Sequence, residues 1–130
     1  MPVRYQIDPD NRVVLTVFRD SITLNDFVSN GAKLAIDPMF QPEFGELMEF
    51  TEGTSMDLSY PDLKAVLDHD PFSIASHRAI VVHSQGVLYC TARMYQLFRD
   101  DAANVAIFSS KTDALSWLVG SWTTVRLRNY

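Results

Sequence analysis

Apolar and polar residues along the chain follow spacings that switch repeatedly between strand and helix. Near the start, Val3, Tyr5 and Ile7 alternate with polar residues, which is typical of a half-exposed strand at a sheet edge. A proline-containing turn over 8–11 separates this strand from residues 13–18, which are apolar on both faces. The second segment is therefore predicted to be a strand inside the sheet.

The first helix is predicted to begin after Thr23, because Thr23 and Asp26 have the spacing of a capping box. Pro38 disfavours helical geometry in the residue before it, so the helix should stop near Asp37. Its apolar residues recur at helical spacing and predict its buried side: Leu24, Phe27, Val28 and Leu34.

The middle of the chain predicts two strands around a second helix. A strand is expected over 45–51. The second helix should begin at Ser59, since Ser59 and Asp62 repeat the capping pattern and Pro61 suits the first turn. The continuous apolar run 79–82 is typical of a buried central strand.

Residues 86–99 predict a long helix, followed by a strand over 105–108 and a last helix from Ser110 to Gly120. Residues 121–130 fit both strand and helix spacing, and form a tail that could extend the domain at an interface. The long helix is expected to point these residues inward: Val87, Cys90, Met94, Leu97 and Phe98.

This order predicts one α/β domain over residues 1–120. Its elements run β-β-α-β-α-β-α-β-α, with helices packed on a mixed, mostly parallel sheet. Ligands on such sheets collect outside the carboxyl ends of the strands, so a site is expected at that edge.

Composition narrows the classes of function. The net charge of −5, from 16 acidic and 11 basic side chains, argues against a nucleic-acid surface. A single cysteine excludes an intrachain disulfide and favours a reducing compartment. With no signal-peptide pattern and no apolar run of membrane-spanning length, we expect a cytoplasmic protein.

Three stretches carry a resemblance to a known fold: residues 34–44, 78–82 and 92–95. Together with the order of elements, they resemble the STAS fold of anti-sigma-factor antagonists. More specifically, the chain is similar to small bacterial SpoIIAA-like proteins, most of which are uncharacterised. The resemblance covers about residues 3–119. It implies a non-catalytic regulatory or protein-interaction domain.

STAS antagonists are phosphorylated on a serine of an Asp-Ser pair at the start of the helix after the third strand. Here residues 51–59 contain no such pair, which departs from the family's pattern. Ser55 is the candidate phosphoacceptor, because Ser59 already serves as a helix cap. Added phosphate near a helix N-terminus would favour the helix and present charge to a partner.

No spacing of chemically active residues predicts a catalytic, cofactor or metal site. The three histidines, His69, His77 and His83, do not have zinc-ligand spacing, and Cys90 falls on an inward helical stripe. Asp70 next to His69 is expected to lie in a solvated loop. We therefore expect no enzyme.

A rim of polar residues remains, because four strand-to-helix loops should meet at one edge of the sheet. Helix N-termini there would attract a small anion, although some hydroxyls could simply cap their own helices. The candidate ligand or partner rim consists of Thr51, Thr54, Ser55, His83, Ser84 and Lys111.

Large apolar residues outside the regular elements should either fold back on the core or form an exposed patch. The second outcome predicts a homodimer. The alternative function is a small-molecule binder for an apolar or anionic ligand, with the lipid-binding CRAL-TRIO group as analogy. A deep apolar cavity would favour the binder, and a flat rim with a large symmetric interface the regulator. The apolar residues are Met39, Phe40, Phe44, Phe72, Trp122 and Tyr130.

Overall fold

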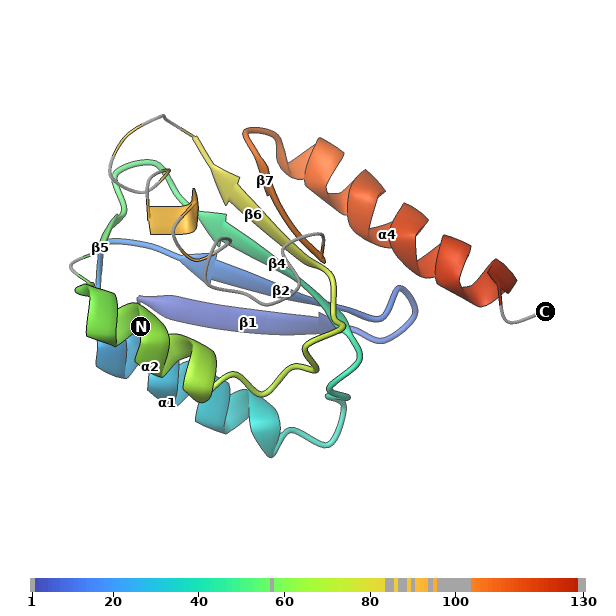
Figure 1. The fold of residues 1–130 in the computed structure, drawn as a ribbon, viewed down its shortest axis with the longest axis horizontal. Coiled ribbons are helices and arrows are strands. Elements are labelled where there is room, and N and C mark those ends of the chain that lie inside the picture. The colour runs from blue at the N-terminus through green and yellow to red at the C-terminus, as the bar shows by residue number, and fades with distance from the viewer. Residues whose placement is uncertain are drawn as a thin grey trace.

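A computed structural model describes residues 2–56, 58–83, 86, 89, 91–93, 95 and 104–128, the last eight as backbone only. Its centre is a five-stranded sheet with the order β1-β2-β4-β6-β7 (Figure 1). β1 and β2 are antiparallel and the other neighbours are parallel. The strands are β1 (Val3–Asp8), β2 (Val13–Phe18), β4 (Gly45–Phe50), β6 (Arg78–Val82) and β7 (Val105–Phe108).

Three helices lie wholly within the described residues: α1 (Leu24–Ala35), α2 (Tyr60–Asp68) and α4 (Lys111–Arg128). α1 and α2 contact each other, whereas α4 packs on β4, β6 and β7. Figure 1 shows the C-terminal end of α4 extending beyond the sheet. None of the helices in the described part of the chain combines the length and hydrophobicity needed to cross a bilayer. The predicted mixed, mostly parallel α/β fold is confirmed.

Both predicted capping boxes are present. The Thr23 side chain accepts from the Asp26 amide, and the Asp26 carboxylate accepts from the Thr23 amide at 2.8 Å. Ser59 and Asp62 make the same reciprocal pair at the start of α2. These local hydrogen bonds satisfy amides that a helix start otherwise leaves unpaired, which is why both starts could be located.

Successive residues of a strand point to opposite faces of the sheet, so the inner strands contribute to two apolar layers. On one face, Leu47, Ala79 and Val81 pack against Ala114 and Leu118 of α4. On the other face, a larger cluster lies under α1 and α2. Its aromatic centre is Phe18, which is stacked on Phe50 at 4.5 Å and tilted against Phe27 at 5.0 Å. Both faces of the inner strands are therefore buried, as expected for a largely parallel sheet.

The apolar loop residues fold back on the core. Phe44 and Phe72 are buried with Leu34, and Phe40 packs edge-on against Phe72 at 5.0 Å. Met39 remains exposed. Trp122 is described only as helical backbone and Tyr130 lies outside the described residues. Most of the described residues in this set thus stabilise the monomer.

The predicted end of the last helix is wrong, because α4 continues through Gly120 to Arg128. A glycine inside a helix costs only about 1 kcal/mol, and no proline follows to interrupt the hydrogen bonding. Residues 121–128 therefore extend the domain's last helix, and the strand alternative for this part of the tail is excluded.

Within the predicted helix 86–99, residues 89, 91–93 and 95 are helical, whereas Gly86 lies in a bend. The residues expected on its inner side lie outside the described part. Ala92 and Tyr95, which were not expected there, are buried against the sheet.

Two glycines make a matched test of the packing. A Cβ at Gly45 would lie 3.1 Å from the His77 carbonyl and 3.3 Å from Leu118, whereas one at Gly31 would make only ordinary contacts with His69 and Pro71. Gly45→Ala is expected to lower the free energy of unfolding by about 1–3 kcal/mol. Gly31→Ala, inside α1, is expected to raise it by about 0.5–1 kcal/mol. Urea unfolding of both variants checks the opposite signs.

Asp37 predicts a pH dependence. The Met39 amide and then the Tyr5 hydroxyl, at 2.8 Å, donate to its carboxylate and hold its pKa below the usual value. A lowered pKa stabilises the fold above the unfolded value of about 4, and that contribution is lost as pH falls through the folded pKa. Asp37→Asn should therefore lower the free energy of unfolding at pH 7, and lower it less at pH 3. Urea unfolding at both pH values measures the two changes. An equal cost at both pH values would contradict this.

Candidate functional site

A charged cluster lies on the buried α1–α2 face of the sheet. The pairing of β4 with β6 sets Glu46 beside Arg78. Both residues share a face with apolar neighbours on their own strands. Their side chains are only 8% and 2% exposed. Charged side chains this deeply buried are stable only when they are paired and hydrogen-bonded.

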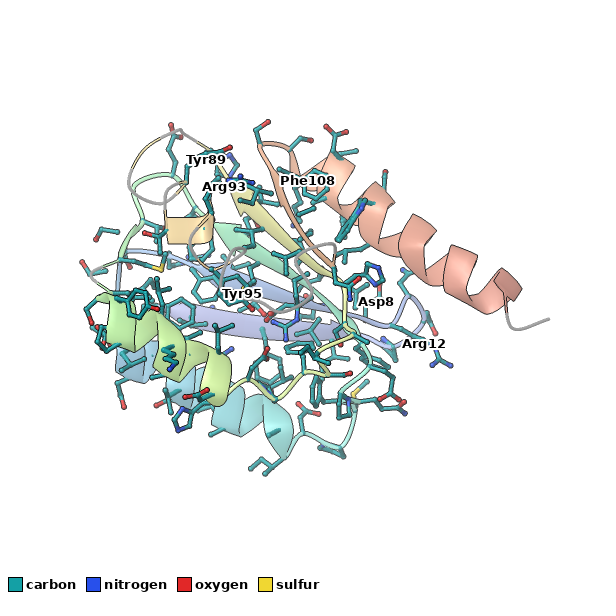
Figure 2. The ribbon with its side chains drawn as sticks, viewed as in Figure 1. Asp8, Arg12, Tyr89, Arg93, Tyr95 and Phe108 are labelled. Atoms are coloured by element: carbon teal, nitrogen blue, oxygen red, sulfur yellow. The ribbon has the colours of Figure 1, made fainter. Side chains whose placement is uncertain are left out.

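Arg78 donates four hydrogen bonds within this cluster. Nη1 donates to Glu46 Oε1 at 3.2 Å and to the Tyr95 hydroxyl at 3.3 Å. Nη2 donates to both oxygens of Asp70, at 2.6 and 2.5 Å. Thr16 donates to the second oxygen of Glu46 at 2.7 Å. Figure 2 shows Tyr95 over the middle of the sheet, where it closes the cluster.

The loop after α2 brings Asp70 to this position. The Asp70 carboxylate accepts from the Phe72 amide at 3.1 Å, which folds the loop over the sheet. The Phe72 ring then lies 4.0 Å from the Arg78 guanidinium, in a cation–π contact. The prediction of a solvated loop around Asp70 is therefore wrong: its side chain is only 13% exposed.

The cluster keeps Arg78 charged. Burial by itself would lower the pKa of the guanidinium, but Tyr95, Glu46 and Asp70 around it outweigh burial, and the pKa is raised above its usual value. The cluster thus holds one permanent cation against two carboxylates. Arg78 Nε is buried and has no hydrogen-bond partner among the described residues.

The cluster forms part of the wall of a cavity of about 90 Å³ between the sheet and its helices. Glu46, Asp70, Arg78 and Tyr95 supply polar groups in the lining. The remainder is largely apolar and comes mainly from α1, α2, the strands β2, β4 and β6, and the segment around Ala92. It includes Phe18, Phe27, Leu34, Met48, Leu63, Ile80 and Ala92. An apolar cavity with a few convergent polar groups is the usual form of a small-molecule site.

A second hollow, of about 220 Å³, lies at the opposite edge, where the parallel strands begin. Its lining comes mainly from loop residues, including Arg12, Glu43 and His77, and none of these three charged or titratable side chains is buried. Figure 2 shows Arg12 at the turn between β1 and β2. We therefore place the candidate site in the first cavity.

The predicted rim separates into two groups. Thr51 and Thr54 lie 2.9 Å apart at their hydroxyls, and both donate to the Phe18 carbonyl. They hold the ends of β2 and β4 together, which is a structural role. Ser55 is exposed in β5 (Ser55–Met56), which pairs with β3 (Ser21–Ile22). The Ser55 and Ser21 hydroxyls are 3.3 Å apart.

The second group surrounds Glu49 on the α4 side of β4. His83 Nε2 lies 3.9 Å from one Glu49 oxygen, and Lys111 Nζ lies 3.7 Å from the other. A carboxylate between the two bases disfavours the anion that the rim was expected to attract. Ser84 lies outside the described residues, as does Cys90.

Sequence reasoning missed the cluster residues Glu46, Asp70 and Arg78. The alternation of side chains along the strands held a usable signal. Glu46 lies on the same face of the sheet as Met48 and Phe50, and Arg78 lies on the same face as Ile80 and Val82. Two opposite charges on inward positions of neighbouring strands indicate a buried ion pair. The partner Asp70 had no such signal, since it lies in a loop.

Comparisons with known proteins agree with the fold. No protein-family model matches the chain, and no curated protein matches it significantly. Among solved structures, it is similar to an uncharacterized protein of the DUF3478 family with a SpoIIAA-like fold from Shewanella loihica PV-4. The TM-score is 0.56 at 23% sequence identity, over 89% of this chain and 93% of that one. The resemblance seen in the sequence is thereby confirmed at the level of architecture: this chain has a SpoIIAA-like fold.

Proposed function

We propose that this protein is a non-catalytic binding domain that holds a small, mostly apolar molecule in the cavity beside Arg78. The observation that carries this proposal is the cavity itself, lined by apolar side chains of the α1–α2 face and bordered by one polar cluster. Of the two functions that the sequence favoured, the small-molecule binder is the one that an apolar cavity supports.

The size of the cavity limits its occupant. About 90 Å³ is less than the roughly 150 Å³ of an engineered apolar cavity that binds benzene, and several times the roughly 30 Å³ that one water occupies in the liquid. A molecule of about five non-hydrogen atoms is of suitable size. A larger ligand would require α1 or α2 to move away from the sheet.

The charges at the cavity support binding rather than catalysis. Glu46 and Asp70 are both held by the Arg78 guanidinium, at 3.2 and 2.5 Å. A carboxylate engaged in this way is poorly placed to exchange a proton with a ligand. The nearby His69 uses Nδ1 in a hydrogen bond with the Ala65 carbonyl at 2.8 Å.

Filling the cavity tests the proposal. Ala92→Leu adds apolar volume to the cavity lining, whereas Ala32→Leu makes the same change at an exposed position of α1. Native mass spectrometry, compared with the denatured mass, should show retained ligand in the wild type and in Ala32→Leu. Ala92→Leu should lose it while keeping its circular dichroism spectrum. Equal retention in both variants would place the ligand elsewhere. No retained mass, and no binding of small apolar probes, would exclude the proposal.

A regulatory or protein-interaction role, as the resemblance implies, is the second candidate. It is favoured by exposed apolar side chains, Ile36, Met39 and Ile74, in the α1–β4 loop and the loop after α2. The Ser73 amide joins these two loops through the Pro42 carbonyl, at 2.7 Å.

A homodimer is the simplest form of such an interaction. Sedimentation of the wild type across a range of concentrations tests it, with Met39→Asp as the variant and Tyr60→Asp, also exposed, as the matched control. Dissociation caused by Met39→Asp alone would support the interface. A monomer at every concentration would exclude it.

The exposed Ser55 remains the candidate phosphoacceptor, and the single cysteine fits a reducing, cytoplasmic location.

A further inference from the structure

The outer edge of β1 is open to another strand. β1 is the outermost strand on its side of the sheet, next to β2 (Figure 1). The Pro2 carbonyl accepts from the Arg19 amide at 2.9 Å, so the even-numbered residues of β1 direct their backbone groups toward β2. The backbone N–H and C=O groups of Val3, Tyr5 and Ile7 therefore point outward, where no described strand pairs with them. An edge of this kind is a template for pairing with another chain.

The side chains along this edge carry opposite charges. Arg4, Gln6 and Asp8 lie on the face of the sheet that α4 covers only at β4, β6 and β7. Arg4 and Gln6 are exposed, and neither side chain has a hydrogen-bond or ion-pair partner among the described residues. Asn11 donates to both oxygens of Asp8, at 2.8 and 3.2 Å, which lowers the pKa of this carboxyl and keeps it charged at neutral pH. The strand thus presents a cation and a fixed anion four positions apart.

We infer that two copies of this chain pair antiparallel through β1, about a twofold axis at Gln6, so that each Arg4 lies opposite the partner's Asp8. In this register Tyr5 lies opposite the partner's Ile7, and the two pairs of this kind exchange about four backbone hydrogen bonds. Cross-strand pairs of opposite charge, and of an aromatic with a β-branched residue, are both favourable. Moving the partner by two residues would place Arg4 opposite the partner's Gln6 or beyond the partner's strand, and the charge pairs would be lost.

The surface beside β1 adds apolar area to this interface. The Tyr5 hydroxyl donates to the Asp37 carboxylate at 2.8 Å, so the loop after α1 adjoins the open edge. Ile36 and Met39 in this segment are 84% and 52% exposed. A strand edge alone is a small surface, and stable interfaces also bury apolar side chains. The inference rests on the homodimer of the second candidate function, for which it names the surface, and it is independent of the cavity.

A cysteine at the proposed twofold axis tests the register. Facing residues of a non-hydrogen-bonded antiparallel pair have Cα atoms about 4.5 Å apart, within the range of a disulfide. Gln6→Cys, combined with Cys90→Ser to remove the native thiol, should therefore form a covalent dimer on oxidation with diamide. Arg4→Cys in the same background is the matched control. It lies on the same face of the strand, but the two copies would be about 14 Å apart, too far for a disulfide. Non-reducing electrophoresis and intact mass measure both.

Charge reversal tests the cross-strand ion pairs without a covalent bond. Sedimentation equilibrium over a range of concentrations should show a dimer for the wild type. Arg4→Asp would set two carboxylates opposite each other at both ends of the interface, and should weaken the dimer about tenfold or more. Lys64→Asp, at an exposed position of α2, makes the same change in net charge and should leave the dimer unchanged. Circular dichroism confirms that each variant is folded.

The outcomes separate this inference from the functions proposed above. A wild type that is monomeric at every concentration overturns both the homodimer and its placement at β1. A dimer that Gln6→Cys does not cross-link, or that Arg4→Asp leaves unchanged, keeps the homodimer and overturns this interface. Equal cross-linking of Arg4→Cys and Gln6→Cys overturns the register. Ligand retention is measured separately on the cavity variants, so none of these results decides whether the cavity binds a small molecule.

Discussion

Arg78→Met is expected to lower the free energy of unfolding by about 3–5 kcal/mol, among the largest effects of any single substitution in this chain. Methionine has a similar length and suits the apolar surroundings, so lost volume is a small part of the cost. The large part arises because Glu46 and Asp70 would be left buried without their cation. Urea unfolding at neutral pH, followed by circular dichroism, measures the loss.

The same reasoning predicts a recovery when the partners are removed as well. Replacing a whole buried charge cluster by groups of similar size is often neutral or stabilising. We therefore expect a combined variant to regain most of the stability that Arg78→Met loses. A combined variant no more stable than Arg78→Met would show that the cluster stabilises the fold in its own right. The combined variant is Thr16→Val, Glu46→Met, Asp70→Asn and Arg78→Met.

Phe72→Ala is expected to lower the free energy of unfolding by about 3–5 kcal/mol, the range for a buried phenylalanine. The ring is buried, contacts the Arg78 guanidinium at 4.0 Å and packs against Phe40 at 5.0 Å. Its removal would leave a void beside the charge cluster and release the loop that carries Asp70. The measurement is again urea unfolding.

Phe72→Leu serves as the matched control. Leucine keeps most of the apolar burial and loses the aromatic face, so we expect a cost of about 1–2 kcal/mol. In the Arg78→Met background the cation–π contact is already absent, and Phe72→Leu should then cost less. The same cost in both backgrounds would show that the contact with Arg78 contributes nothing measurable.

Local patterns were sufficient for most of the secondary structure. The ends of α1 and the start of α2 followed from residues a few positions apart, such as Thr23 with Asp26 and Ser59 with Asp62. The alternation of β1 and the unbroken apolar run of β6 correctly indicated an edge strand and a central strand. These features were readable because hydrogen bonds and burial within one element depend on neighbours along the chain.

The end of α4 and the burial of Ala92 and Tyr95 were not readable in this way. In both segments, the alternative structures that the apolar spacing allows are close in local energy. Packing against the sheet decides between them. Propensity is a weak guide where tertiary contacts supply most of the stability of a helix.

The sequence by itself determined the class of fold, the order of the five strands of the main sheet with α1, α2 and α4, and the likeness to SpoIIAA-like proteins. It did not predict the short strands β3 and β5. Only the tertiary structure decided the candidate site. Arg78 meets Glu46, which is 32 positions away, and Tyr95, which is 17 positions away, because strand pairing and helix packing bring them together. Burial then turns these ordinary polar residues into a charge cluster beside a cavity, since only a water-poor interior makes the count of charges and hydrogen bonds decisive.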